Sequence, residues 1–120
     1  MSDEIPIGKS VPLLYFSGKE SKFELYWPKF EAYANLKGFS EAIQVTRDSE
    51  LPAKENVIDG TDDAAKAVQK KAVTRNKLAI ACFTMSFKTT ALMNRISDAK
   101  TSDYPGGLAH LVTKGLMERF

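Results

Sequence analysis

Residues 61–87 read TDDAAKAVQKKAVTRNKLAIACFTMSF, and this stretch decides the fold. Its apolar residues follow helical spacing, and Thr61 or Asp62 can cap the first turn, so we expect one long helix that ends near Phe87. The first half is amphipathic, whereas the second half, which starts at Leu78, is apolar on almost every side. Because a helix that is apolar all round is buried, this half should form the centre of the fold or lie in an oligomer interface.

An earlier helix is predicted between Ser21 and Lys37. Its apolar residues recur every three or four positions, which is the spacing of one helical face: Phe23, Trp27, Phe30 and Ala34. Ser21 and Glu24 fit a capping box, in which each side chain satisfies a backbone N–H of the other residue. Pro28 is comfortable only in a first helical turn, so the main helix should start near Tyr26, with residues 21–25 as a separate turn.

Short segments flank this helix on either side. Before it, Val11 to Phe16 is an apolar run that we interpret as extended chain laid on the helical core, because six residues are too few to identify a strand. After it, Gly38 stands where a C′ glycine ends a helix. Phe39 and Ile43 then fit a short helical turn that returns the chain to the core.

Two shorter helices are predicted after the long one. Residues 88–90 break the pattern, and the helix that follows should end near Asp98. Asp103 or Tyr104 can cap a last helix that has Pro105 early in it. The apolar face of this last helix consists of Leu108, Leu111, Val112, Leu116 and Phe120. The sequence therefore predicts an all-α fold, a compact bundle of about four to five helices with an extended N-terminal segment.

The length of 120 residues suits one domain. We expect residues 1–12 to be a flexible lead-in, because Pro6, Gly8 and Pro12 punctuate it, and residues 13–120 to form a single helical domain. Within this domain, residues 44–60 form a long polar loop. Loops of this length are uncommon in compact domains and are often functional or disordered, so the loop is the best candidate for a mobile element.

Composition limits the class of protein. The pI of about 8.6 and the net charge of +2 are too mild for a typical nucleic-acid-binding domain, whose pI is above roughly 9. The single cysteine, Cys82, cannot form an intrachain disulfide, which predicts a reducing, intracellular and cytoplasmic location. Residues 1–10 lack the apolar run of a signal peptide, and no stretch reaches the ~18 apolar residues of a membrane span, so we expect no membrane association.

Residue types that carry catalysis or bind metals are sparse. His110 is the only histidine, and Cys82 lies in the most apolar segment, so we interpret them as a surface or capping-turn histidine and a small buried thiol. The acidic pair at residues 62–63 and the acidic residues of the 44–60 loop lack the spacing of a calcium-binding loop. We therefore expect no enzyme activity, no metal or other cofactor, and no small-molecule substrate.

Basic side chains of the long helix are the candidate nucleic-acid contact. They fall on or beside one stripe, called the basic stripe below: Lys66, Lys70, Lys71, Arg75 and Lys77. Such a stripe can contact phosphates, and each contact adds salt-sensitive affinity. A solvated helix face is the alternative interpretation. No aromatic residues interleave with the stripe, so base stacking is not indicated.

Five apolar or aromatic residues are candidates for a protein interface. Tyr26 and Tyr33 lie seven positions apart and can present a second face of their helix to a partner, although helical spacing is also typical of core residues. Phe87, Leu116 and Phe120 are the candidates on the long helix and the last helix. Since the chain ends on an apolar residue, we interpret its end as the edge of a fragment or as a terminus that docks onto a partner.

Two segments carry a resemblance to a known family. One holds Phe16-Ser17-Gly18 and then Trp27, Phe30, Ala34, Leu36 and Gly38; the other holds Tyr104-Pro105-Gly106-Gly107-Leu108-Ala109-His110 and continues to Leu116 and Phe120. The first is similar to the "F-x-G … W … L-x-x-x-G" opening of Gag polyproteins from copia-type LTR retrotransposons. The second is similar to the helix of those proteins that starts "P-x-G-x-A" and ends "L … F/Y". Residues 78–87 stand where the family has an "A … L" helix.

The resemblance implies the N-terminal part of a capsid region, which is helical, self-associates into virus-like particles, encloses element RNA and has no catalytic residues. The zinc knuckle that captures RNA in such proteins is missing, because Cys82 stands alone. Our first hypothesis is therefore a capsid-like domain that forms homo-oligomers. The alternatives are a helical adaptor that binds another protein, and a helical domain that makes weak RNA contacts through the basic stripe.

Overall fold

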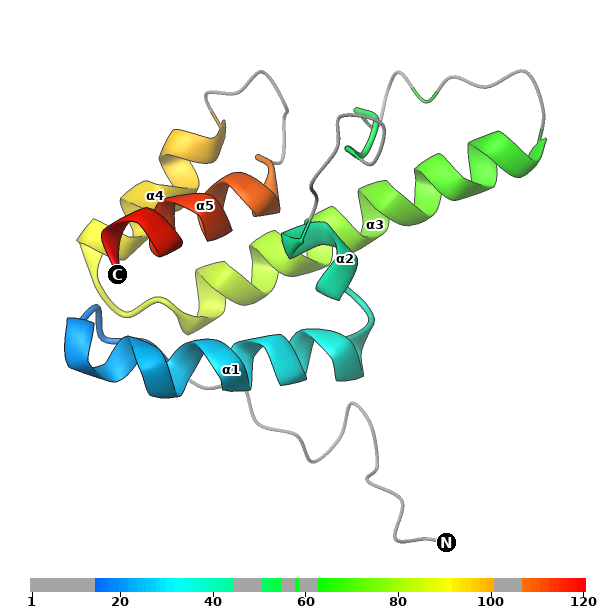
Figure 1. The fold of residues 1–120 in the computed structure, drawn as a ribbon. Helices are drawn as coiled ribbons and strands as arrows, with labels where there is room; N and C mark the ends of the chain where they lie inside the picture. The colour runs from blue at the N-terminus through cyan, green and yellow to red at the C-terminus, as the bar shows by residue number, and fades with distance from the viewer. Residues whose placement is uncertain (1–14, 45–50, 55–57, 59–62, 101–106) are drawn as a thin grey trace, which may run out of the picture.

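The computed structural model describes residues 15–44, 51–54, 58, 63–100 and 107–120. Within these ranges no strand forms, and the chain folds into five helices: α1 Glu20–Lys37, α2 Ser40–Ile43, α3 Asp63–Ser86, α4 Thr90–Lys100 and α5 Ala109–Arg119. The longest helix, α3, crosses the molecule, with α1 along one side and α4 and α5 on the other (Figure 1). The predicted all-α bundle is confirmed.

Aromatic rings form the centre of the core and join α1 to α3. The ring of Phe83 stacks on Phe30 with the two centroids 4.6 Å apart, and on Trp27 with a separation of 6.3 Å. Phe39 meets Phe30 edge-on at 5.8 Å. Stacked and edge-to-face pairs in this distance range contribute about 0.5–1.5 kcal/mol each beyond the area they bury. As predicted, the second half of the long helix is the central element of the fold.

The same helix is less buried than its sequence predicts. We expected residues 78–87 to be enclosed on almost every side, yet Leu78 is 38% exposed and Met85 is 66% exposed. Val68, an apolar residue of the amphipathic first half, is 64% exposed. The physical reason is that α1 on one side and α4 and α5 on the other leave a strip of α3 uncovered, and that the first turns of α3 project beyond the rest of the bundle (Figure 1).

Two details predicted for the first helix are wrong. α1 runs without a break from Glu20 to Lys37, so residues 21–25 are not a separate turn. Pro28 lies inside the helix, where its missing N–H leaves the carbonyl of Glu24 without a helical partner. Both residues are exposed, so water can satisfy that carbonyl. The capping box is also absent, because Lys19 is the N-cap and makes no side-chain capping bond.

The turn after α1 follows the prediction. Gly38 has a φ of 85°, a left-handed conformation that favours glycine, and its N–H donates to the carbonyl of Ala34 at 2.8 Å. The N–H of Phe39 donates to the same oxygen at 2.9 Å. Phe39 and Ile43 are both buried, so α2 returns the chain to the core, where it packs on α3 and α5.

The N-terminal segment is held at the end of α3 by its backbone. The N–H of Phe16 donates to the carbonyl of Ser86 at 2.8 Å, and the N–H of Lys88 donates to the carbonyl of Phe16 at 3.1 Å. The Phe16 ring is buried and stacks on Tyr26 with centroids 4.7 Å apart. At Phe16 the prediction of extended chain laid on the core is confirmed. The predicted lead-in and most of the 44–60 loop lie outside the described residues.

A buried amide from α3 caps α5. The side chain of Asn76 donates from Nδ2 to the carbonyl of Gly107 at 2.8 Å, and its Oδ1 accepts from the N–H of Ala109 at 2.9 Å. The residue at the N-cap, Leu108, has no side chain that can form such a bond. Asn76, which is distant in sequence, therefore provides an acceptor for a backbone N–H at the start of α5, a role that a serine or aspartate at the N-cap position often has. The prediction that residue 103 or 104 caps this helix is wrong, because α5 begins at Ala109.

Candidate functional site

Three of the five predicted interface residues belong to the core. Tyr26, Phe87 and Leu116 are all buried, so their side chains do not reach a partner from this fold, and their assignment to an interface is wrong. The reason is that Tyr26 and Leu116 occupy the inward faces of their helices, and that Phe87, directly after α3, also packs into the core. The core interpretation, which the sequence left open for the tyrosines, is the correct one for Tyr26.

The hydroxyl of Tyr26 is part of a buried hydrogen-bond chain. It lies 2.8 Å from the Oγ of Ser86, which is 3.2 Å from the carbonyl of Phe83. Since the serine hydroxyl gives its one hydrogen to that carbonyl, Tyr26 donates to Ser86. Burial raises the pKa of Tyr26, an effect that the hydrogen bond to Ser86 partly opposes. The phenol is therefore neutral at physiological pH and serves to join α1 to α3.

Tyr33 and Phe120, the other two candidates, are half-buried. The ring of Phe120 lies 5.2 Å from that of Phe16 and 5.1 Å from that of Phe23, so the last residue docks onto its own chain. The ring of Tyr33 packs edge-on against Phe39, and the ammonium of Lys37 lies 5.5 Å from its centroid. Part of the Tyr33 side chain remains accessible to a partner.

The exposed apolar residues are not among the five candidates for an interface, although the second half of the long helix was expected to form the centre of the fold or to lie in an oligomer interface. Seven large ones stand out among the described residues: Tyr15, Leu25, Val68, Leu78, Met85, Met93 and Met117. Leu78 and Met85 lie two helical turns apart on one side of α3, with exposed Ala81 between them. We call these three residues the α3 seam. The available signal was their 3-4 spacing, which in a segment apolar on every side does not distinguish an outer face from an inner one.

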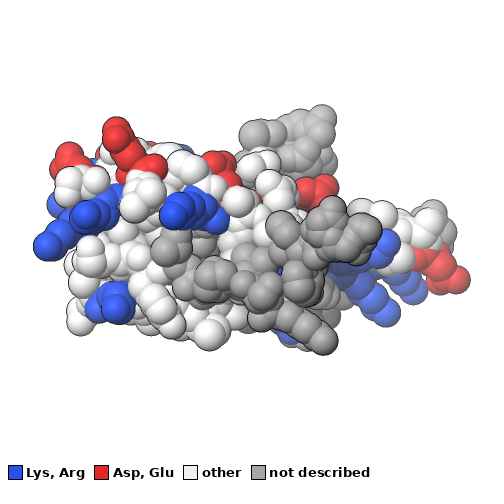
Figure 2. Space-filling model, turned by 90° about the horizontal axis from the view of Figure 1, so that it is seen from below, with Lys and Arg blue, Asp and Glu red and all other residues white. Residues whose placement is uncertain are grey.

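The basic stripe is a surface feature, as expected from its sequence. Lys66, Lys70, Lys71 and Lys77 are exposed, whereas Arg75 is half-buried. Figure 2 shows basic side chains gathered along the projecting end of α3, with an acidic side chain at its tip. The fold brings three of the five residues together around one depression and leaves Lys66 and Lys77 outside its lining.

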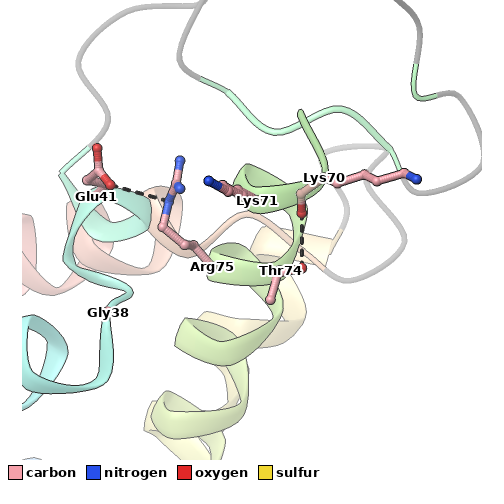
Figure 3. A pocket seen from close by; sticks show the side chains of 6 residues that line it. All are labelled: Gly38, Glu41, Lys70, Lys71, Thr74 and Arg75. Atoms are coloured by element: carbon pink, nitrogen blue, oxygen red, sulfur yellow. Dashed lines mark hydrogen bonds and ion pairs between the residues drawn. The ribbon is translucent and has the colours of Figure 1, made fainter. Parts of the chain in front are cut away.

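That depression lies between α3 and the corner at which α1 meets α2. It has a volume of about 380 Å³ and is lined by Gly38, Glu41, Lys70, Lys71, Thr74 and Arg75 (Figure 3). We call it the basic hollow. The Nε of Arg75 lies 3.6 Å from the Oε1 of Glu41, across the gap between α3 and α2. Sequence reasoning missed Glu41, because no local pattern connects it with a helix more than twenty residues further along the chain.

The residues that most often carry covalent chemistry are in structural positions. Cys82 is buried, and burial raises the pKa of its thiol, an effect that Lys37 partly opposes. His110 is half-buried in the first turn of α5; burial, and then the charge of Lys114, lowers its pKa. Both groups are therefore neutral near pH 7, and a protonated thiol is a poor nucleophile. In the part of the chain that the structure describes, no three potential metal ligands cluster together.

Across the described ranges, none of the helices combines the length and apolar character needed to cross a bilayer. Comparison of the chain with family models, with curated proteins and with solved structures finds no match. The candidate functional surfaces of the described residues are therefore the apolar α3 seam and the basic hollow, both of which involve α3.

Proposed function

We propose that this chain is an assembly domain of the cytoplasm, which acts by self-association and not by catalysis. Its role is that of the N-terminal part of a Gag-like capsid region, the family that its sequence resembles. The observation that carries the proposal is the α3 seam, in which Leu78, Ala81 and Met85 are exposed at the spacing of a helix-packing face.

The α3 seam is suited to pairing with a second copy of itself. A two-fold interface uses the same patch on both subunits. In an antiparallel pair of α3 helices with the axis near Ala81, Leu78 of one copy faces Met85 of the other. The small side chain at the axis lets the two helices approach closely. The large side chains then fill the space on either side of it.

The magnitudes predict weak association. Full burial of an exposed leucine or methionine contributes about 1.5–3 kcal/mol. Because Leu78 is 38% exposed and Met85 is 66% exposed before pairing, the four large side chains of such a pair contribute about 3–6 kcal/mol. The lost translational and rotational freedom costs about 4–15 kcal/mol. At the low end of that cost the two terms nearly cancel, so we expect dimers that form at high protein concentration. Stable particles then require further contacts, for which exposed Met93 and Met117 are candidates.

Light scattering coupled to size exclusion, over a range of protein concentrations, tests the proposal. The unmodified chain should grow reversibly from monomer to dimer or larger species. Met85→Lys and Leu78→Lys should hold it as a monomer, because each places a charge in the α3 seam. Leu25→Lys is the matched control, since it makes the same change at an exposed residue of α1.

Each result of this experiment has a separate meaning. If Leu25→Lys blocks association while Met85→Lys does not, the interface lies on α1 and the α3 seam is not the contact. A chain that stays monomeric at every concentration contradicts self-association. The α3 seam is then a docking face for a different protein, which is the adaptor hypothesis.

A further inference from the structure

We propose that the basic hollow binds a phosphate-bearing anion, with Arg75 and Lys71 as its anchors and Glu41 as an internal competitor for Arg75. The inference rests on charges and contacts in the hollow and does not depend on self-association. Phosphate is the ligand class because the lining offers planar guanidinium and ammonium donors, the two groups that bind phosphate oxygens most often.

The lining carries an excess of positive charge. Three of its six residues are cationic, and Glu41 is the one acidic residue among them. On α3 itself no acidic residue follows Asp63, so this side of the hollow offers only cations. An anion that enters the hollow therefore meets three cations and one carboxylate, and this net positive charge raises both its local concentration and its rate of association.

Two of these cations lie in an unfavourable arrangement. Lys71 and Arg75 are four residues apart on α3, and the Lys71 side chain points toward Arg75, whereas Lys70 extends away from it (Figure 3). Like charges at this spacing destabilise a helix by about 0.2–0.5 kcal/mol. A phosphate bound between the two side chains changes this repulsion into two attractive contacts. The arrangement is what an anion site is expected to have before its ligand arrives.

The contact between Glu41 and Arg75 is loose enough for a ligand to replace. The separation of 3.6 Å exceeds the ~2.7–2.9 Å of a charge-assisted hydrogen bond. The Glu41 side chain is 77% exposed and that of Arg75 is 26% exposed, so the carboxylate can swing into water while the guanidinium stays in place. The hydroxyl of Thr74 donates to the carbonyl of Lys70 at 3.0 Å and has no hydrogen left for a ligand. The cations alone therefore hold the anion.

A phosphate in this hollow can come from a free oligophosphate or from the backbone of RNA. The volume of about 380 Å³ lies at the small end of ligand sites, which suits one or a few phosphate groups. The two sources differ in salt dependence, because a nucleic acid releases condensed counterions when it binds and a free oligophosphate carries far fewer of them. A paired experiment can therefore distinguish them.

Titration calorimetry with inorganic tripolyphosphate is the first arm. We expect saturable binding at low salt that Lys71→Gln and Arg75→Gln each weaken by about fivefold or more, the factor that corresponds to one contact between unit charges in water. Glu41→Gln should strengthen binding, because it removes the competitor. Lys22→Gln, an exposed residue of α1, is the control: it removes the same charge outside the hollow and should leave the affinity unchanged.

Fluorescence anisotropy with a labelled single-stranded RNA, repeated over a series of salt concentrations, is the second arm. If RNA is the source, the Lys71→Gln variant should bind it more weakly, and the slope of log affinity against log salt should fall by about one. Binding of tripolyphosphate together with no effect of these variants on RNA assigns the hollow to a free oligophosphate.

Three results overturn the proposal. One is the absence of binding to either probe. Another is an equal loss in Lys22→Gln, which shows that net charge and not the hollow attracts the anion. The last is an unchanged affinity in Glu41→Gln. Far-ultraviolet circular dichroism of each variant checks the fold, and exposed Lys71 provides the test if the half-buried Arg75 proves necessary for folding.

Discussion

The two halves of α3 form one continuous helix in different surroundings. From Asp63 to Ala72 no residue is buried, whereas from Val73 onward the inner face is enclosed by the rest of the bundle. The first half is rich in alanine and lysine, which have high intrinsic helix propensity. The second half holds bulkier residues that pack. Local propensity is the main support of the first half, whereas tertiary contacts support the second, and Lys70 and Lys71 of the first half are exposed at the basic hollow.

The largest expected effect lies in the packed half. Phe83→Ala should lower the free energy of unfolding by about 3–5 kcal/mol, because the phenylalanine ring is fully buried and the change leaves a cavity between α1 and α3. Urea denaturation followed by circular dichroism measures the loss. Val68→Ala, in the projecting half, is the control and should change stability by less than about 0.5 kcal/mol. Equal losses in the two variants contradict the division of the helix.

The next effect concerns the amide that caps α5. Asn76→Ala leaves the carbonyl of Gly107 and the N–H of Ala109 buried without their partner, so it should cost about 1–3 kcal/mol. Hydrogen exchange should increase first at the Ala109 amide, since that amide loses its acceptor. Asn35→Ala, an exposed asparagine of α1, controls for the residue change. Unchanged protection at residue 109 shows that the cap is dispensable.

The bond between Tyr26 and Ser86 should contribute less, about 0.5–1.5 kcal/mol, measured as the loss of stability in Tyr26→Phe. The burial of Tyr26 also predicts a pH dependence of stability. Because burial raises the pKa of Tyr26 in the folded state, the stabilisation is complete below the unfolded pKa of about 10 and is lost as pH rises above that value. Denaturation curves at a series of alkaline pH values should show this decline, and Tyr26→Phe should reduce it. A decline of equal size in the variant assigns it to another group.

The smallest effect tests the projecting half directly. Ala67→Gly should cost at most about 1 kcal/mol, because glycine has the lower helix propensity and no tertiary contact amplifies the change. Most of the loss should appear as reduced helicity by circular dichroism, with an almost unchanged urea midpoint. A large shift of the midpoint means that this half also packs against another surface, such as a second copy of the chain.

The features that the sequence predicts well are those set by local interactions. The extent of α3, the glycine that ends α1 and the return of Phe39 to the core all follow from local spacing and backbone preferences, and the structure agrees with each. For residues 78–85 the sequence leaves core and oligomer interface open, because an apolar segment with no polar stripe carries no information about which side faces outward.

Long-range contacts account for the other errors. Pro28 is tolerated because the carbonyl it leaves unpaired faces water, which depends on how α1 docks. Asn76 caps a helix that begins 33 residues later. The basic hollow joins Glu41 to Arg75 across two elements. Asn76 and Ala109, like Glu41 and Arg75, lie more than 30 residues apart in the sequence. Periodicity over one helix therefore identifies the single cations but not the site that they form with Glu41.

The pairing of Phe16 with the end of α3 has a consequence for the order of folding. Its two backbone bonds close a loop of about 70 residues, whereas the contacts of α3 with α4 and α5 span much shorter stretches. Contacts distant in sequence form slowly, because the closure entropy must be overcome before they stabilise anything. We therefore expect the unit of α3, α4 and α5 to fold first and the N-terminal segment to join it last. During biosynthesis, Phe16 leaves the ribosome early and must wait for its partner residues.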